Sequence, residues 1–138
     1  MIIVIDTNVL ISALIKDSLT RRIIVGYGMD FVYPEISLHE IRKHEKLIIK
    51  KSGLTVDEFH RLLARILDYV VLVPTEVIEE HVREAKSIMC DIDPKDTVFI
   101  ATALSFENAV IWSEDKDFDK QDKIKVVKTR QLARLFEK

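Results

Sequence analysis

Five short apolar runs, separated by segments with helical spacing, dominate the pattern of this chain. The runs cover residues 1–5, 31–33, 70–73, 109–112 and 126–127. Each run is continuously apolar instead of alternating with polar residues, which is typical of buried strands in a parallel sheet with helices on both faces. The pattern therefore predicts a three-layer α/β/α sandwich with a mainly parallel five-stranded sheet.

Helices are expected between these strands, and capping residues mark their ends. The expected helices cover residues 9–15, 20–25, 37–51, 55–67, 75–89, 94–104 and 129–137. Thr20 and Asp93 are expected caps, and Thr55 begins a capping box with Glu58. Gly53 is expected to end the helix before that box. With the first strand in the centre, the order of the elements predicts the sheet order 3-2-1-4-5.

The first strand ends at Asp6, which is followed by Thr7 and Asn8. In parallel sheets, ligands bind beyond the carboxyl ends of the strands, at the point where neighbouring connections leave in opposite directions. The predicted sheet order puts Asp6 at that point. Asp6 therefore either contributes to a site at this edge or caps the helix that follows it.

Length and composition limit the class of protein. The 138 residues suit one domain, and we expect residues 1–138 to form it. The 21 basic and 23 acidic residues give a net charge of -2, so any binding of nucleic acid must rely on a local surface. The single Cys90, with no signal peptide and no long apolar segment, favours a reducing, cytoplasmic setting without a membrane anchor.

Five carboxylates fall at the same edge of the predicted sheet. They are Asp6, Glu40, Asp96, Asp115 and Asp117. Carboxylates gathered in this way repel one another and raise their own pKa values unless divalent cations lie between them. Oxygen ligands without Cys or nearby His suit Mg²⁺ or Mn²⁺ better than Zn²⁺. The pattern therefore predicts a magnesium or manganese site.

Each acid also has a structural explanation. Ser37 and Glu40 match a capping box, in which the glutamate would fold back on the backbone. Asp96 can complement a helix dipole, and Asp115 and Asp117 can be turn residues. Independent caps and turns would not be expected to choose one edge of one sheet, so their coincidence with Asp6 favours a site.

Several segments resemble the motifs of PIN-domain ribonucleases. The similar segments are residues 4–10, 96–104 and 112–118, together with the helical Glu40. The similarity extends over essentially the whole chain, and the nearest branch is the VapC-like toxins of bacterial and archaeal toxin-antitoxin pairs. The resemblance implies a PIN-like fold and a metal-dependent endoribonuclease that hydrolyses RNA phosphodiester bonds with metal-activated water.

The resemblance also implies roles for individual residues. The catalytic acidic quartet, which would hold one or two Mg²⁺ or Mn²⁺ ions, is Asp6, Glu40, Asp96 and Asp115. Asp117 would be an additional acid at the metal, and Asn8 and Ser113 would orient ligands or water. The implied partners are an RNA substrate, an antitoxin protein and a second copy of the chain in a homodimer.

Basic residues near the acids are candidates for binding the RNA backbone, because an acidic site repels RNA. They are Lys16, Arg21, Arg22, Arg42, Lys43, Lys46 and Lys116. Each of them is also explained as a solvated surface charge. Tyr33 and Phe118 can stack on bases, although packing in the core or in a turn is the stronger interpretation.

Other functions are weighed against the nuclease. A non-catalytic, metal-stabilised RNA-binding or protein-docking module with the same fold stays an alternative. Zinc proteolysis is excluded, because His39 and His44 stand one position too far apart to share a helix face. No glycine-rich phosphate loop follows the first strand, which excludes nucleotide binding of the P-loop or Rossmann type.

Overall fold

The computed structural model describes residues 1–15, 18–89 and 93–136, and this part of the chain contains one parallel sheet. The strands are β1 (Ile2–Ile5), β2 (Asp30–Pro34), β3 (Val70–Val73), β4 (Val110–Trp112) and β5 (Val126–Val127). The order β3-β2-β1-β4-β5 confirms the prediction, and every neighbouring pair is parallel. In the central strand, Val4 pairs with Val32 on one side and with Ile111 on the other.

Helices connect the strands. The α-helices of the described residues are α1 (Thr7–Ile15), α2 (Leu19–Gly26), α3 (Leu38–Lys43), α4 (Glu45–Ser52), α5 (Val56–Leu67), α6 (Thr75–Glu79), α7 (Val82–Met89), α8 (Thr97–Leu104) and α9 (Thr129–Phe136). The same residues also form three short 3-10 helices, η1 (Glu35–Ser37), η2 (Pro94–Asp96) and η3 (Lys116–Lys120). No helix in the described ranges has both the length and the apolar character needed to cross a membrane.

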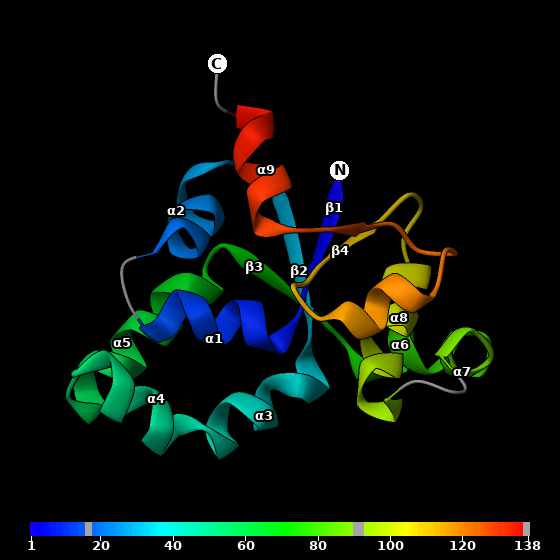
Figure 1. Cartoon of the computed structure of the whole chain (residues 1–138). Coiled ribbons are helices and arrows are strands. Elements are labelled where there is room, and N and C mark those ends of the chain that lie inside the picture. The colour runs from blue at the N-terminus through cyan, green and yellow to red at the C-terminus, as the bar shows by residue number, and fades with distance from the viewer. Residues whose placement is uncertain (16–17, 90–92, 137–138) are drawn as a thin grey trace.

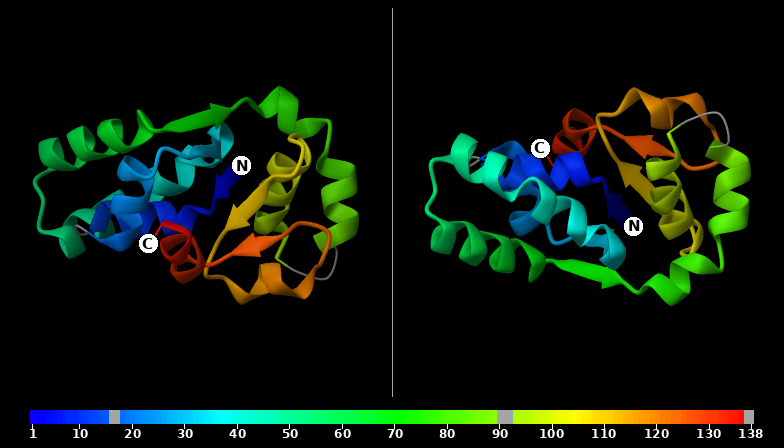
Figure 2. Two further views of the ribbon diagram at one scale, coloured as in Figure 1. Left: turned by 90° about the horizontal axis from the view of Figure 1, so that it is seen from above. Right: turned by 90° about the horizontal axis from the view of Figure 1, so that it is seen from below.

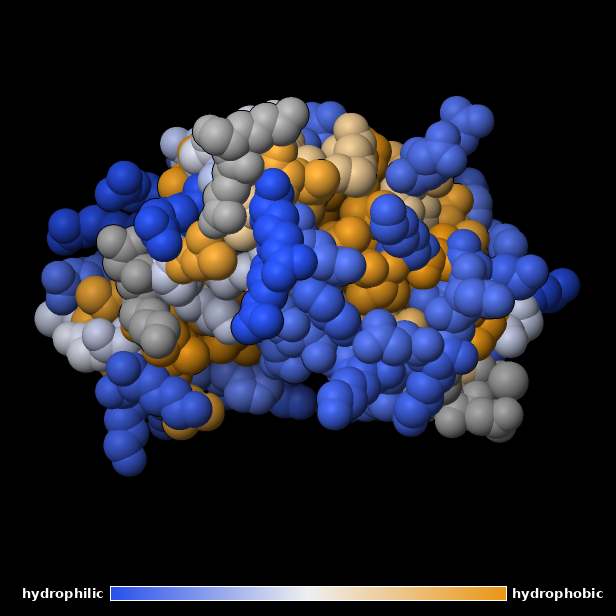
Figure 3. Space-filling model, turned by 45° about the horizontal axis from the view of Figure 1, so that its top comes forward, coloured by the Kyte–Doolittle hydropathy of each residue, from blue (hydrophilic) through white to orange (hydrophobic). Residues whose placement is uncertain are grey.

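The helices form a layer on each face of the sheet (Figures 1 and 2). On one face α1 packs against α2, α4 and α5, and α9 packs against α2. On the other face α8 lies against β1, β2 and β4 and is itself covered by α6 and α7. This is the three-layer sandwich that the apolar runs predict. Side chains on the visible surface are largely hydrophilic, with apolar patches between them (Figure 3).

The strands and the loop after β4 are anchored by fully buried side chains. Ile5 and Trp112 are 0% exposed, and Tyr33 packs against Phe99 with ring centroids 6.1 Å apart. Phe118 is also 0% exposed and meets Phe99 edge-on at 6.3 Å. Burying such a ring stabilises the fold by about 2–3 kcal/mol. The core interpretation of Tyr33 and Phe118 is therefore confirmed, and Phe118 holds the loop that carries the last acids.

Several predicted caps are present in the structure. Thr55 and Glu58 form the capping box of α5 with both reciprocal hydrogen bonds. Asp93 caps η2 by accepting from the backbone N–H of Lys95 at 3.0 Å. Gly53 ends α4 with a φ of 74°, a conformation that glycine adopts without steric cost.

The predicted cap of α2 is wrong. Ser18, not Thr20, caps this helix, because its hydroxyl accepts from the backbone N–H of Arg21 at 3.3 Å. Thr20 is buried inside the helix instead. Two hydroxyl residues within one turn offer equivalent caps, and only the path of the chain into the helix decides between them.

Two expected helices are each divided. The helix expected over residues 37–51 breaks at His44, whose ring Nδ1 lies 2.8 Å from the Glu40 carbonyl oxygen. The ring competes for that oxygen, and the backbone N–H of His44 is shared between the carbonyls of Glu40 and Ile41. The helix expected over residues 75–89 breaks where His81 N–H bonds three residues back, in a tighter turn than an α-helix allows.

Candidate functional site

β1 delivers Asp6 to the carboxyl edge of the sheet. The side chain is 5% exposed, and both of its oxygens accept hydrogen bonds. Oδ2 accepts from the hydroxyl of Ser113 at 2.6 Å, and Oδ1 accepts from the backbone N–H of Asn8 at 3.4 Å. Ser113 directly follows β4, so the parallel pairing of β1 with β4 creates this contact.

Ser113 connects Asp6 to the loop after β4. Its hydroxyl donates to Asp6 and accepts from the backbone N–H of Asp115 at 2.9 Å. Asp115 in turn caps η3, because its Oδ1 accepts from the backbone N–H of Asp117 at 2.9 Å. One chain of hydrogen bonds therefore fixes the positions of three acids.

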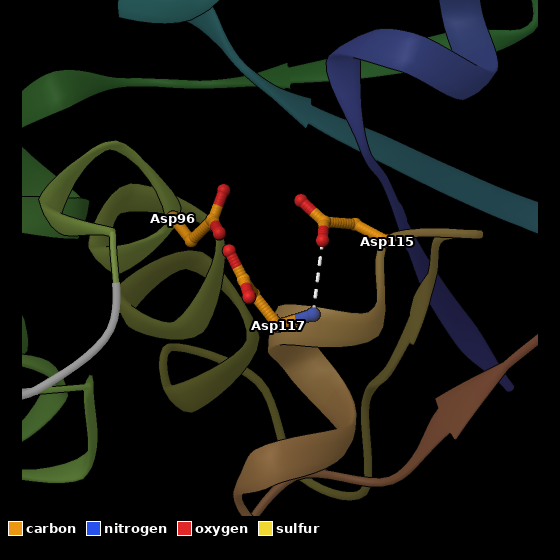
Figure 4. Close-up of side chains that lie close together, drawn as sticks. All are labelled: Asp96, Asp115 and Asp117. Atoms are coloured by element: carbon orange, nitrogen blue, oxygen red, sulfur yellow. Dashed lines mark hydrogen bonds between the residues drawn. The ribbon is translucent and has the colours of Figure 1, made fainter.

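The acids of this loop meet Asp96, which precedes α8. Asp96, Asp115 and Asp117 each present a carboxylate oxygen within 4.8 Å of the others. Figure 4 shows the three side chains turned toward one another across the gap between η2 and the loop. Asp96 is 8% exposed, and its Oδ2 is buried without any hydrogen-bond partner among the described residues. We call these three residues the acid cluster.

Burial and repulsion shift the protonation of the two most buried acids. Burial, together with the negative charges of nearby acids, raises the pKa of Asp96 to about 7. Those acids are Asp115, Asp6, Asp93 and Asp117. Burial also raises the pKa of Asp6, but the hydrogen bonds from Ser113 and Asn8 oppose that shift. The edge therefore carries more negative charge than the protein alone neutralises.

The acid cluster fits a divalent cation. An unpartnered buried oxygen and three converging carboxylates are a costly arrangement, and a cation between them removes the cost. All donors are carboxylate oxygens, which suits Mg²⁺ or Mn²⁺. Asp117 also forms an ion pair with Lys120 at 3.0 Å on an exposed part of the loop. Asp6 lies outside the trio but close enough for its charge to act on Asp96.

Glu40 lies apart from the acid cluster, half-buried on α3. The capping box expected for it is wrong, because Ser37 makes no side-chain hydrogen bond to the start of α3. Glu40 instead lines a hollow of about 260 Å³ together with Lys43 and Lys95. Its carboxylate is thus available to solvent or to a ligand beside two cations.

A buried hydroxyl network joins the Asp6 turn to the start of α3. The hydroxyls of Thr7 and Tyr33 lie 2.8 Å apart, and Tyr33 donates to the carbonyl oxygen of Ser37 at 3.0 Å. Burial raises the pKa of Tyr33, and the charges of Glu40 and Asp6 add to the shift. The sequence offers no spacing signal for this network, because its members come from three separate elements.

The loop acid Glu114 has a structural role. Its Oε1 accepts from the backbone N–H of Thr129 at 2.8 Å and so satisfies a free donor in the first turn of α9. The hydroxyl of Thr129 accepts from the indole N–H of Trp112 at 2.9 Å. Together these bonds tie α9 to the end of β4, next to Asp115.

The predicted RNA-binding cations are placed unevenly. Arg21 uses its Nε to donate to the Ala13 carbonyl oxygen at 2.7 Å, so this group is engaged in the fold. Lys43 lines the hollow with Glu40. Lys16 lies outside the described residues, as does Cys90. The remaining candidates are exposed: Arg22, Arg42, Lys46 and Lys116. Cations near the site that the sequence analysis did not select are Lys95, Lys128 and Arg130.

Comparison with known proteins gives one family match. The profile described as PIN domain matches residues 4–135, nearly the whole chain. No curated protein sequence and no solved structure matches the chain significantly.

Proposed function

Since the chain belongs to the PIN domain family, we propose that it is a metal-dependent endoribonuclease that hydrolyses RNA phosphodiester bonds. PIN domains are generally nucleases. The observation that carries the proposal is the buried, unpartnered Oδ2 of Asp96, which belongs to three carboxylates within 4.8 Å of one another. Nothing in the described structure neutralises that oxygen, and a divalent cation does so with the right chemistry.

Asp96, Asp115 and Asp117 would hold one or two Mg²⁺ or Mn²⁺ ions, with Asp6 completing the set from β1. Such ions, when bound, make water acidic and neutralise charge on the phosphate. Ser113 keeps Asp6 and the backbone of Asp115 in a fixed relation through its two hydrogen bonds.

The α3 side of the site supplies a different set of groups. Glu40 adds a carboxylate at the rim, and Lys43 and Lys95 place positive charge around it. We assign these two cations to the RNA backbone, which an acidic site would otherwise repel. The network of Tyr33 with Thr7 and Ser37 holds α3 at a fixed distance from Asp6.

The finer parts of the proposal rest on the resemblance in sequence. They are that residues 1–138 act as a single nuclease domain, that the protein is the VapC-like toxin of a toxin-antitoxin pair, and that it works in the cytoplasm. An antitoxin protein and a second copy of the chain, in a homodimer, are the proposed protein partners.

Cleavage of a mixed pool of single-stranded RNA, with Mn²⁺, Mg²⁺ or EDTA, tests the proposal. Wild type is compared with Asp96→Asn and with Asp122→Asn, which removes an exposed charge from the loop after η3. Metal-dependent cleavage that Asp96→Asn abolishes and Asp122→Asn retains supports the nuclease. Cleavage that persists in EDTA contradicts it.

Thermal melts of the same samples separate catalysis from binding. If no sample cuts RNA but Mn²⁺ raises the Tm of wild type and not of Asp96→Asn, the acid cluster binds metal without cleaving. That result would favour the alternative of a metal-stabilised RNA-binding or docking module.

A further inference from the structure

Two adjoining hollows lead away from the acid cluster along α1, α2 and α9. The polar hollow, of about 310 Å³, is bordered by Asp115 and lined by Asn8, Val9, Ser12, Thr20, Glu114 and Thr129. The basic hollow, of about 500 Å³, is lined by Leu19, Glu114, Lys128, Thr129, Arg130 and Gln131. Because Glu114 and Thr129 line both, the hollows share a wall.

The polar hollow presents neutral hydrogen-bonding groups. Ser12 donates to the Asn8 carbonyl oxygen at 3.1 Å, and its hydroxyl oxygen can still accept. Thr129 accepts from the Trp112 indole, which leaves its own hydroxyl proton to donate. Since Trp112 is 0% exposed and rigidly packed, Thr129 is held in one orientation. A nucleotide, with its ribose hydroxyls and base edges, has groups that match such walls.

The negative charge in the polar hollow is smaller than its two carboxylates, Glu114 and Asp115, suggest. Glu114 accepts a hydrogen bond from the first turn of α9, where the helix dipole is positive. Asp115 is the remaining acid, and it lies where the hollow opens to the acid cluster. A phosphodiester chain therefore meets carboxylates only at the position where metal is proposed to bind.

Positive charge increases farther along the same path. Lys128 already pairs with Asp119 at 3.1 Å. Arg130 is exposed and has no ion pair or hydrogen bond within the described residues. Its guanidinium can therefore bind a phosphate without first breaking another interaction.

We propose that these hollows bind single-stranded RNA on one side of the scissile phosphate, with one nucleotide in the polar hollow and the next phosphate at Arg130. The volume of the polar hollow is at the lower end of ligand pockets, roughly 300 Å³, which suits one unpaired nucleotide and no duplex. The inference rests on the proposed nuclease function, because it takes the acid cluster as the cleavage point.

A charge reversal at Arg130 tests whether RNA follows the two hollows, which we call the RNA path. Arg130→Glu is compared with Arg134→Glu, an exposed arginine one turn farther along α9 that does not line either hollow. We measure the Kd of a fluorescein-labelled single-stranded RNA in EDTA across a salt series, and the KM for its cleavage in Mn²⁺. Arg130→Glu should raise both constants about 5- to 10-fold and reduce the salt slope of binding by about one, with kcat unchanged. Arg134→Glu should change neither.

A second variant tests the polar hollow. Thr20→Val keeps the shape of a residue that is 8% exposed and removes its hydroxyl. It should weaken RNA binding about 2- to 5-fold without changing the salt slope, because a neutral hydrogen bond is lost. Thermal melts confirm that each variant is folded.

The outcomes separate the path from the chemistry. Equal effects of Arg130→Glu and Arg134→Glu, or no effect of Arg130→Glu on Kd and KM while wild type cleaves RNA, overturn the path and leave the nuclease intact. Binding that depends on Arg130 without any cleavage supports the path and contradicts the nuclease. If wild type neither binds nor cuts RNA, both are wrong.

Discussion

Two buried aspartates at the same edge of the sheet differ in how far hydrogen bonds compensate their charge. Asp6, after β1, has a hydrogen-bond donor for each oxygen, from Ser113 and from the backbone of Asn8. Asp96, before α8, keeps Oδ2 buried without a partner and is surrounded by other acids. Hydrogen bonds offset part of the cost of burying the charge of Asp6, whereas nothing in the described structure offsets it for Asp96, whose charge requires a proton or a cation.

This difference indicates which part of the site lowers the stability of the fold. An unsatisfied buried polar group costs about 1–3 kcal/mol of stability, and a charged one costs more. That cost falls on the β4 and α8 side of the edge, not on β1. We therefore expect removal of the charge at Asp96 to stabilise the metal-free protein more than removal of the charge at Asp6, which also weakens the hydrogen bond from Ser113.

The largest expected effects come from Asp96→Asn and Asp6→Asn. Both should lower Mn²⁺-dependent cleavage by roughly 10²–10³-fold, the usual loss for one preorganised electrostatic group at an active site. In EDTA at pH 8, Asp96→Asn should raise the Tm, and it should do so by more than Asp6→Asn, because only Asp6 loses a charge-assisted bond from Ser113. Thermal melts measure both. A lower Tm for Asp96→Asn would contradict the comparison.

Ser113→Ala should have the next largest effect. The variant removes the donor to Asp6 and the acceptor for the Asp115 backbone, so both acids lose their fixed orientation. Loss of a supporting partner of this kind costs about 10–100-fold in metal affinity or activity. Mn²⁺ titration and cleavage rates measure it. Ser87→Ala, at an exposed serine of α7, is the control and should leave both unchanged.

How far the sequence predicts this edge depends on which physical signal is involved. The convergence of Asp96, Asp115 and Asp117 follows from strand ends and helix starts, which apolar runs and caps reveal. The unpartnered oxygen of Asp96 and the hydrogen bonds of Ser113 depend on side-chain rotamers. The pattern of apolar and polar residues does not predict rotamers. The sheet order was predictable because crossovers between parallel strands are right-handed and short.

Local competition between hydrogen bonds explains most of the differences. The break at His44 arises because a ring nitrogen competes for a carbonyl oxygen, which helical periodicity does not record. Ser37 and Glu40 have the spacing of a capping box, yet the bond is absent. Tyr33 is a core residue, as the sequence predicts. Its hydroxyl also connects α1 to the start of α3, which the sequence does not predict.

A moderate effect is expected from pH on the metal-free protein. The pKa of Asp96 is about 7 in the folded chain and 3.8 ordinarily, so the folded state binds more protons than the unfolded state between these values. Stability should therefore be greatest below pH 4 for this group and fall as pH rises through 7. Urea unfolding in EDTA from pH 5 to pH 8 measures the slope. Asp96→Asn should reduce it, and a stability that rises with pH through this group would contradict the prediction.

The smallest effect is expected from Tyr33→Phe. The variant keeps the buried ring and removes the hydroxyl that bridges Thr7 and Ser37, which should cost about 1 kcal/mol of unfolding free energy. Cleavage should fall only a few-fold, because α3 and Glu40 shift relative to Asp6 while the acid cluster stays intact. Urea unfolding and cleavage rates test this, with Tyr69→Phe at a 52% exposed tyrosine as control. A loss as large as that of Ser113→Ala would place the hydroxyl network at the centre of the site.

The bond between Asp6 and Ser113 joins residues that stand 107 positions apart. A ribosome releases β1 long before Ser113, Asp115 and Asp117 emerge, because 107 positions separate Asp6 from Ser113. Contacts between such distant positions also form slowly during folding. The acidic edge of this fold can therefore be assembled only after residues 1–117 have all been synthesised.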